Sequence, residues 1–139
     1  MVQGKYTHLW LFRKKNGRWT VDTVMREFMN PVGHIESDYH GTRWVGHLHE
    51  GLYAVRLSND LQSIESIVDM GSLSDSNPQP VNIFKVNNRV VFTDRSCFYT
   101  YDDIRKEIVP YSQFNDRLGP ASHAYMVCHF IDNLYWFIS

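Results

Sequence analysis

Histidines are the first residues in this sequence whose type and spacing suggest chemistry. The chain of 139 residues holds seven of them, and His47 and His49 lie two residues apart. Residues two apart on a strand point to the same side, so these two imidazoles could share a metal ion. Apart from Glu50, no carboxylate or cysteine stands beside them at a familiar ligand spacing. We therefore expect no metal site and no cofactor.

Carboxylates are the second candidate, because general acid and base catalysis needs two such groups that face one another. Asp102 and Asp103 are neighbours in the chain, and neighbouring side chains on a strand point to opposite faces. We expect them to cap the turn that follows Tyr101. Ser72 and Ser76 lie in a polar, turn-rich segment where the sequence places no base. The sequence therefore predicts no catalytic residue and no enzyme.

Charge and hydropathy exclude several classes of partner. The net charge is −1, and the basic cluster at residues 13–15 directly precedes a hairpin turn, where it forms a solvated tip. Nucleic-acid binding needs a larger basic surface with aromatic residues among it. No run approaches the roughly 20 apolar residues of a membrane span, and residues 1–5 lack the apolar segment of a signal peptide. We expect no nucleic acid and no direct membrane contact from this segment.

The segments that must position these residues have the pattern of short antiparallel strands. Residues 35–68 contain a turn at 38–41, a strand that carries Trp44, a strand that begins at Leu52 and a weaker strand over 63–68. Tight turns between short alternating runs predict a four-stranded antiparallel sheet. The strong turn signal Asn16-Gly17 predicts a hairpin between residues 6–13 and 18–24.

The four-stranded unit recurs at a constant step. Successive units align at three positions 46 residues apart: Trp44, Val90 and Trp136. Three residues earlier stand types that tolerate the left-handed backbone of a tight turn: Gly41, Asn87 and Asn133. A period in the mid-forties with four strands per unit is typical of propeller blades. The alternative is an ordinary β-domain with evenly spaced hairpins.

The predicted fold is therefore all-β, as one propeller fragment of four-stranded antiparallel sheets over residues 1–139, with about three blades in total. Its parts are a half blade over 6–24, blades over 34–68 and 81–109, and a half blade over 124–138. A closed propeller takes about four to eight blades, so we expect the chain to be cut from a longer protein. Alternatively, the half blades pair into one composite blade, within the molecule or between two copies, because open edges invite association.

Loops at one end of the predicted sheets hold the residues that we expect to meet a ligand. In propellers this end is formed by the connections between second and third strands and between fourth and next first strands, here residues 47–50, 94–96, 70–80 and 110–122. The candidate ligand-binding residues are His47, His49, Glu50, Asp94 and Arg95. Such a surface suits a polar ligand such as a glycan, or a partner protein. The alternative is that these are solvated loops of a scaffold.

One motif extends these observations to a family. Asp38-x-x-Gly41-x-x-Trp44-Val45-Gly46-His47, with Gly51-Leu52-Tyr53 after it, resembles the repeat of two-component regulator propellers. Residues 90–93 with residues 98–103 resemble it too, although Val90 replaces the tryptophan and Cys97 the glycine. The resemblance runs from about Thr7 to Ile138. Such propellers form the extracytoplasmic sensory region of large bacterial regulators, which are hybrid histidine kinases or carry a LuxR-type DNA-binding domain.

The resemblance implies a non-catalytic, periplasmic sensory segment that recognises a ligand, often an oligosaccharide from carbohydrate breakdown. The kinase or DNA-binding parts of such regulators would lie outside this sequence. The alternative function is a structural or dimerisation module without a ligand of its own, which forms a homodimer through open blade edges. A propeller-fold hydrolase is a third hypothesis, and it requires carboxylates that converge on one face.

Overall fold

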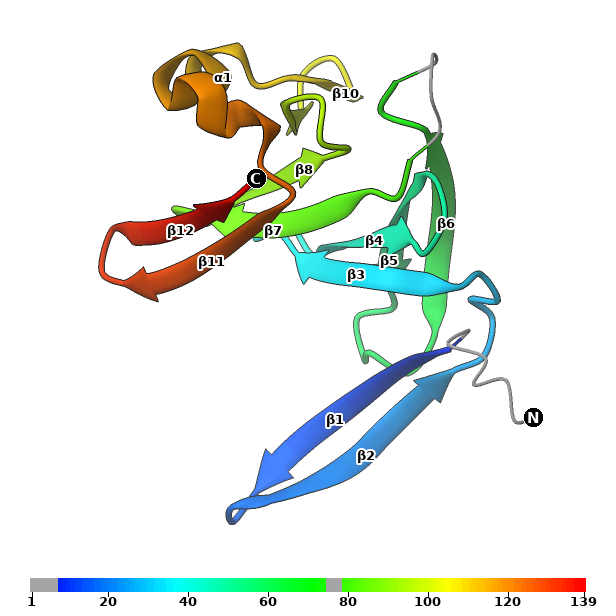
Figure 1. Ribbon diagram of the computed structural model, residues 1–139. Coiled ribbons are helices and arrows are strands. Elements are labelled where there is room, and N and C mark those ends of the chain that lie inside the picture. The colour runs from blue at the N-terminus through cyan, green and yellow to red at the C-terminus, as the bar shows by residue number, and fades with distance from the viewer. Residues whose placement is uncertain (1–7, 75–78) are drawn as a thin grey trace, which may run out of the picture.

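The computed structural model describes residues 8–74 and 79–139 of the chain (Figure 1). The strands are β1 (Leu9–Lys15), β2 (Arg18–Met25), β3 (Val32–Ser37), β4 (Thr42–His47), β5 (Leu52–Leu57), β6 (Ile64–Gly71), β7 (Asn82–Val86), β8 (Arg89–Thr93), β9 (Phe98–Asp102), β10 (Glu107–Pro110), β11 (Met126–Ile131) and β12 (Leu134–Ile138). A short helix α1 (Ser112–Leu118) and a 3-10 turn η1 (Gly119–His123) join β10 to β11. The all-β prediction is confirmed.

The strands form four antiparallel sheets in chain order. We name β1-β2 the N-terminal hairpin, β3-β4-β5-β6 the first complete sheet, β7-β8-β9-β10 the second complete sheet and β11-β12 the C-terminal hairpin. Their limits lie within a few residues of the predicted ones, while residues 6 and 7 of the predicted first half blade lie outside the described part. Within the described part no sheet closes on itself. In the described part the two hairpins belong to separate sheets, so the alternative in which the half blades pair within one molecule is wrong.

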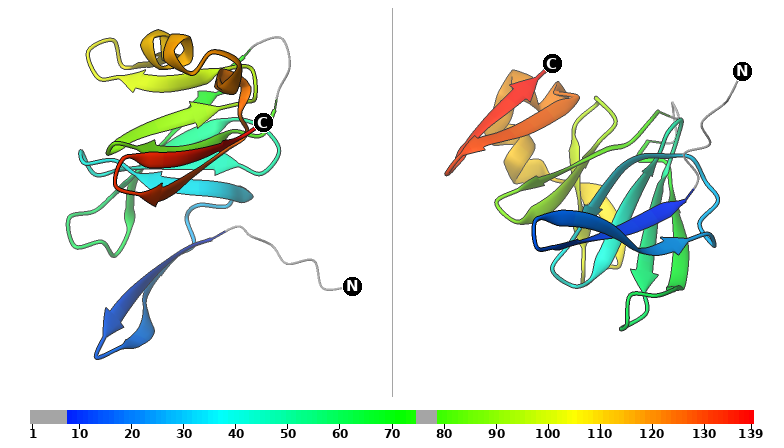
Figure 2. Two further views of the ribbon diagram at one scale, coloured as in Figure 1. Left: turned by 60° about the vertical axis from the view of Figure 1, so that its left-hand side comes forward. Right: turned by 90° about the horizontal axis from the view of Figure 1, so that it is seen from below.

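The two complete sheets and the C-terminal hairpin stack in a row, and apolar clusters fill the spaces between them. Phe28, Val45 and Val55 form a cluster on the other face of the first complete sheet, and Leu9 of the N-terminal hairpin packs against it. Trp44 and Phe92 belong to the cluster between the two complete sheets. A third cluster, between the second complete sheet and the C-terminal hairpin, consists of Val86, Val91, Phe98, Ala124 and Val127. Each complete sheet therefore has an apolar cluster on both faces. The C-terminal hairpin has one on a single face, whereas most of the N-terminal hairpin is exposed. Figure 2 shows the sheets from two directions.

The first strand of each unit lies on the same side of the row. β3 contacts β7, and β7 contacts β11, whereas β6 and β10 lie at outer edges (Figure 1). The ring of His34 on β3 meets the ring of Phe84 on β7 with centroids 5.8 Å apart. Asn82 donates a hydrogen bond of 2.7 Å from Nδ2 to the carbonyl oxygen of Tyr125. These contacts fix the orientation of successive sheets about their first strands.

The two complete sheets approach each other closely at Gly46. A Cβ atom at this position would lie 2.4 Å from the carbonyl oxygen of Val81. Real Cβ atoms do not approach backbone oxygen so closely, so a side chain here would push β4 and the start of β7 apart. Glycine at this position allows the first strand of one sheet to pack tightly against the second strand of the sheet before it.

One part of the predicted repeat is shifted by a residue. Trp44 points toward the following sheet, but Val90 points back toward the preceding one, because Val90 shares a cluster with Trp44 itself. The residue that points forward from β8 is Val91. In the first complete sheet the connection between β4 and β5 runs between the paired residues Gly46 and Leu52. In the second, the connection between β8 and β9 runs between Thr93 and Phe98, and it is one residue shorter. Since side chains alternate along a strand, this single residue exchanges the two faces of β8.

The corrected alignment also explains the turns. Val91 lies 47 residues after Trp44 and 45 residues before Trp136. Asn87 and Asp132 are also 45 residues apart, and each has a φ of 49°. Asn133 was expected to be the left-handed residue of the last turn, and that prediction is wrong, because Asp132 takes this conformation. Both turns use a short polar side chain that tolerates left-handed backbone.

Among residues 8–74 and 79–139, no helix is both long enough and apolar enough to cross a membrane.

Candidate functional site

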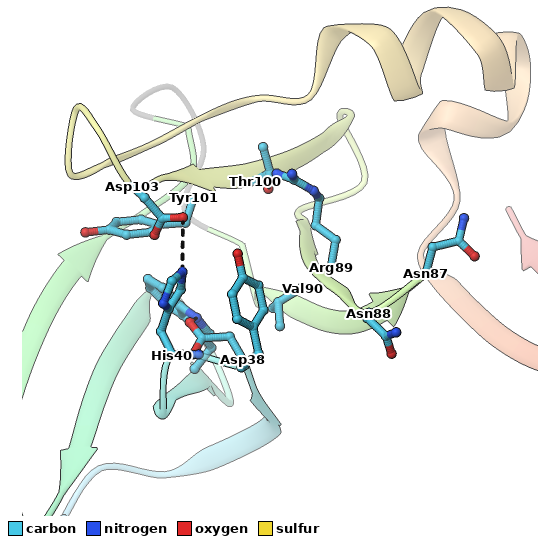
Figure 3. Close-up of a pocket in the computed structure, with 11 residues that line it drawn as sticks. Asp38, His40, Asn87, Asn88, Arg89, Val90, Thr100, Tyr101 and Asp103 are labelled. Atoms are coloured by element: carbon cyan, nitrogen blue, oxygen red, sulfur yellow. Dashed lines mark hydrogen bonds and ion pairs between the residues drawn. The ribbon is translucent and has the colours of Figure 1, made fainter.

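The hollow that we consider the candidate site lies between the two complete sheets, at the end where the first strand turns into the second. It consists of two adjoining parts of about 210 and 460 Å³. Both parts are lined by Asp38, His40, Trp44, Tyr101 and Asp103. Figure 3 shows the smaller part, with the turn before β4 on one side and strands β8 and β9 on the other. We call this hollow the inter-sheet cleft.

Asp38 forms the floor of the cleft on the side of the first complete sheet. Its Oδ1 accepts hydrogen bonds from the backbone N–H groups of His40 and Thr42, at 3.0 and 2.9 Å. Its Oδ2 accepts a hydrogen bond of 2.9 Å from the indole Nε1 of Trp44. Gly41 completes the turn with a φ of 88°. The spacing Asp38-x-x-Gly41-x-x-Trp44 is therefore explained by one turn whose carboxylate holds the buried indole in place.

His40 and Asp103 connect the two sheets across the mouth of the cleft. The Nε2 atom of His40 lies 3.5 Å from Oδ2 of Asp103, as the dashed line in Figure 3 shows. The Tyr39 ring packs against the His40 imidazole with centroids 4.2 Å apart. Tyr39 and His40 are both exposed to solvent. The turn before β4 and the turn after β9 thereby share one polar contact.

The adjacent carboxylates Asp102 and Asp103 have different surroundings. Oδ1 of Asp102 accepts hydrogen bonds from the backbone N–H groups of Ile104 and Arg105, at 2.9 and 3.0 Å. Those bonds, from Arg105 first, lower the pKa of Asp102 because they favour its ionised form. The prediction that this pair caps the turn after Tyr101 is thus confirmed for Asp102, whereas Asp103 lines the cleft.

Tyr101 forms the aromatic wall on the side of the second complete sheet. The centroid of its ring lies 4.9 Å from that of the Trp44 ring. The Phe92 ring also contacts Trp44, with centroids 5.1 Å apart. Burial raises the pKa of Tyr101, and the nearby charge of Asp103 raises it further. The phenol therefore stays protonated and can donate a hydrogen bond at any pH at which proteins are normally studied.

Cationic side chains line the two ends of the cleft. Arg89 lies in the smaller part, where its Nη1 is 3.4 Å from Oγ1 of Thr100 and its guanidinium sits over the Tyr111 ring at 5.4 Å. Arg56 and Lys106 line the larger part. The cleft therefore offers aromatic faces, hydrogen-bond donors and the acceptor oxygens of Asp103 within one depression. Such a lining is chemically suited to molecules that carry both apolar faces and several hydroxyl groups.

The predicted site residues of the first complete sheet lie outside this cleft, at the end of β4 and in its connection to β5. The Nδ1 atom of His47 accepts hydrogen bonds from the backbone N–H groups of His49 and Glu50, both 3.2 Å long. The His47 and His49 rings lie 5.8 Å apart. In this arrangement His47 stabilises its own turn.

The predicted residues of the second complete sheet lie in the matching connection between β8 and β9. Asp94 is buried, and its Oδ1 accepts hydrogen bonds from the backbone N–H of Ser96, at 3.0 Å, and from the Ser96 hydroxyl. The Arg95 guanidinium lies over the Tyr125 ring at 5.1 Å. These two residues therefore support the loop and its contact with the segment before β11. Their role in ligand binding stays a prediction.

Two further expectations concern the loops and metals. Within residues 8–74 and 79–139, no group of three or more His, Cys, Asp or Glu side chains is arranged to hold a metal ion. Residues 75–78 of the predicted ligand-facing loop, including Ser76, lie outside the described residues.

The sequence alone did not identify the cleft residues His40, Arg89 and Asp103. The Asp38–Gly41 turn and the Asp102-Asp103 pair both attracted attention, but as turns within separate units. The signal that could have joined them is the common position of both turns, because in a stack of meandering sheets they lie at the same end.

Comparisons with protein-family models, with curated proteins and with solved structures found no match to this chain.

Proposed function

We propose that this chain is a non-catalytic ligand-recognition segment, built from propeller-type blades, of a bacterial two-component-type regulator. In this proposal the segment is periplasmic and binds a hydroxyl-rich molecule such as an oligosaccharide. The propeller assignment is supported by the row of meandering sheets, whose first strands lie side by side and whose forward-pointing positions are Trp44, Val91 and Trp136. The regulator and its location are proposed from the resemblance of the repeat motif.

The observation that carries ligand recognition is the inter-sheet cleft. Aromatic rings line its depth, and the cationic and acidic groups of Arg89, Arg56 and Asp103 lie around its opening. A sugar ring presents an apolar face for stacking and hydroxyl groups for such hydrogen bonds. A recognition role fits better than hydrolysis, because the oxygens of Asp38 are occupied by donors of its own turn and by Trp44.

The second candidate function is a structural or dimerisation module of such a regulator, with no small-molecule ligand of its own. Apolar side chains exposed on both hairpins favour it: Trp10, Phe12, Trp19, Phe130 and Trp136. In this case the cleft is a gap between two sheets, and the polar contact between His40 and Asp103 stabilises their packing.

A panel of neutral and acidic oligosaccharides, tested by thermal shift and then by titration calorimetry, distinguishes the two functions. We expect a member of the panel to stabilise the protein. Loss of a hydrogen bond to a charged group costs about 1.5–3 kcal/mol, so Arg89→Ala and Asp103→Asn should each weaken binding about tenfold or more. Glu50→Gln, in the β4–β5 loop, is the matched control and should bind normally.

The opposite pattern has a definite meaning. If Glu50→Gln and Arg95→Ala weaken binding while the cleft variants bind normally, the loops are the site and the cleft is not. If no sugar stabilises the protein, the structural module becomes the better description of this chain.

A further inference from the structure

We propose that the saccharide bound in the inter-sheet cleft is acidic, and that Arg89 binds its anionic group, which is a carboxylate or a sulfate ester. This inference rests on the proposal that the cleft binds a saccharide, and it names the chemical class of that ligand. It follows from an imbalance in the lining of the cleft, because the carboxylates already have partners within the protein and the cations do not.

The carboxylates that line the cleft are Asp38 and Asp103. Asp38 accepts hydrogen bonds from two backbone N–H groups of its own turn and from the indole N–H of Trp44. Oδ2 of Asp103 lies 3.5 Å from Nε2 of His40. The acidic groups of the lining are therefore already matched by donors of the protein, so a cationic ligand is not the one that the cleft fits best.

The cations that line the cleft are Arg56, Arg89 and Lys106. Within residues 8–74 and 79–139, none of these three side chains forms an ion pair. Other cations of the protein do have carboxylate partners, as Arg13 and Arg105 show. Three positive side chains of the cleft thus stand against two negative ones, and a ligand with an anionic group supplies the charge that the lining does not contain.

Arg89 is the cation whose position is best fixed for binding an anion. Its guanidinium lies over the Tyr111 ring, 5.4 Å from the centroid, and its Nη1 is 3.4 Å from Oγ1 of Thr100. Most N–H donors of the guanidinium remain available, and less rotamer entropy is lost on binding because the side chain is already restrained. By contrast, the side chains of Arg56 and Lys106 form no hydrogen bond with the described part of the chain.

The position of Arg89 within the cleft also suits an acidic saccharide. Figure 3 shows its guanidinium near Thr100 and away from Asp103. The planar guanidinium matches the paired oxygens of an anionic group. A saccharide can therefore place its anionic group at Arg89, while its other rings and hydroxyl groups reach the Tyr101 ring and Asp103 without bringing two negative charges together.

Pairs of saccharides that differ only in charge test the inference. Uronic-acid oligosaccharides of several sugars are each compared with their methyl esters, and sulfated oligosaccharides with their unsulfated parents, by titration calorimetry. We expect the acidic member of at least one pair to bind about tenfold or more tightly than its neutral partner. Higher salt should weaken the binding of the acidic member more than that of the neutral one. The pair that shows the difference identifies the anionic group as a carboxylate or a sulfate.

Arg89→Gln tests which side chain binds the anionic group. Glutamine retains N–H donors but removes the charge, so the affinity for the acidic member should fall toward that for its neutral partner. Binding of the neutral partner should change little, which also shows that the variant is folded. Arg26→Gln is the matched control, because Arg26 is exposed between β2 and β3 and does not line the cleft. It removes the same charge and should keep the preference for the acidic member.

Several results would overturn the inference. Equal binding of acidic and neutral members would do so and would leave saccharide recognition in place. A preference for the acidic member that survives Arg89→Gln, or that Arg26→Gln reduces equally, would show that Arg89 does not bind the anionic group. If no saccharide of either kind binds, this inference and the proposed function fall together.

Discussion

Trp44 and Trp136 occupy the same place in two sheets of this protein, and their surroundings differ completely. Each lies on the second strand of its sheet and points toward the position of the next sheet. Trp44 is covered by the second complete sheet and is 2% exposed, whereas Trp136 is 63% exposed. The Trp44 indole donates its N–H to Asp38, whereas the Trp136 ring makes an aromatic contact with Phe130, with ring centroids 6.3 Å apart.

This difference teaches that burial in a row of sheets depends on the neighbour and not on the strand. A tryptophan on a second strand forms a core when another sheet packs over it, as Phe92 and Tyr101 do over Trp44. Without such a cover the same residue type forms an exposed apolar face, which in a soluble protein commonly marks an interaction surface. Stability and association are thus two outcomes of one repeated position.

Removing each tryptophan is the strongest way to test this comparison. Trp44→Ala should lower the free energy of unfolding by about 3–5 kcal/mol, because it leaves a cavity between two sheets. Trp136→Ala should lower it by less than about 1 kcal/mol, as surface substitutions usually do. Chemical denaturation at concentrations that favour single chains measures both values. Equal losses would show that the two positions are not in different surroundings.

Gly46 tests how closely the covered sheets approach. Gly46→Ala should cost about 1–3 kcal/mol, because the new methyl group would overlap the carbonyl oxygen of Val81. Gly33→Ala is the matched variant: its Cβ would meet the Cα of Leu48 at 3.3 Å, a milder contact, so the loss should be smaller. The same unfolding measurement applies, and a reversed order would contradict the close packing of β4 against β7.

Asp38 tests the hydrogen bond that distinguishes the covered tryptophan. Asp38→Ala leaves the Trp44 indole N–H without its acceptor and should cost about 1–2 kcal/mol. Asp60 also organises a turn, by accepting bonds from Ser58 and Gln62, but it holds no buried side chain. Asp60→Ala should therefore cost less than Asp38→Ala. The tryptophan emission of the protein, to which Trp44 contributes, should change with the first variant and not with the second.

Replacing His34 should have the smallest effect on the free energy of unfolding, and this effect should depend on pH. Burial lowers the pKa of His34, so the unfolded chain binds a proton more readily than the folded one. The stability that the neutral imidazole supplies at its contact with Phe84 is complete above the unfolded pKa of about 6.5 and is lost as the pH falls below it. Unfolding free energies at several pH values should therefore decrease on acidification, and His34→Gln should reduce this slope. An unchanged slope would assign the acid sensitivity to other groups.

Much of the local structure follows from local residue types. Asn16-Gly17 predicted the N-terminal hairpin, and alternation with turn residues predicted the strands of both complete sheets to within a few residues. Strand edges and tight turns depend on conformational preferences of neighbouring residues, and those preferences are visible in a single sequence.

The candidate site was less predictable. The loop residues His47 and Asp94 were chosen because their types suggest chemistry, and the structure shows that both accept hydrogen bonds within their own turns. The cleft brings together His40 and Asp103, which are 63 residues apart and belong to different sheets. Their meeting depends on how two sheets pack, and local preferences do not encode that.

By itself the sequence determined that this protein consists of short antiparallel strands in repeated units, because alternation and turn residues act over a few positions along the chain. Tertiary structure decided which face of each strand is covered. A connection shorter by one residue places Val91 where the even step of 46 placed Val90, since successive side chains of a strand point in opposite directions. Tertiary structure also decided that Trp44 belongs to a core and Trp136 to a surface, because a second sheet is needed to bury a side chain on the face of the first.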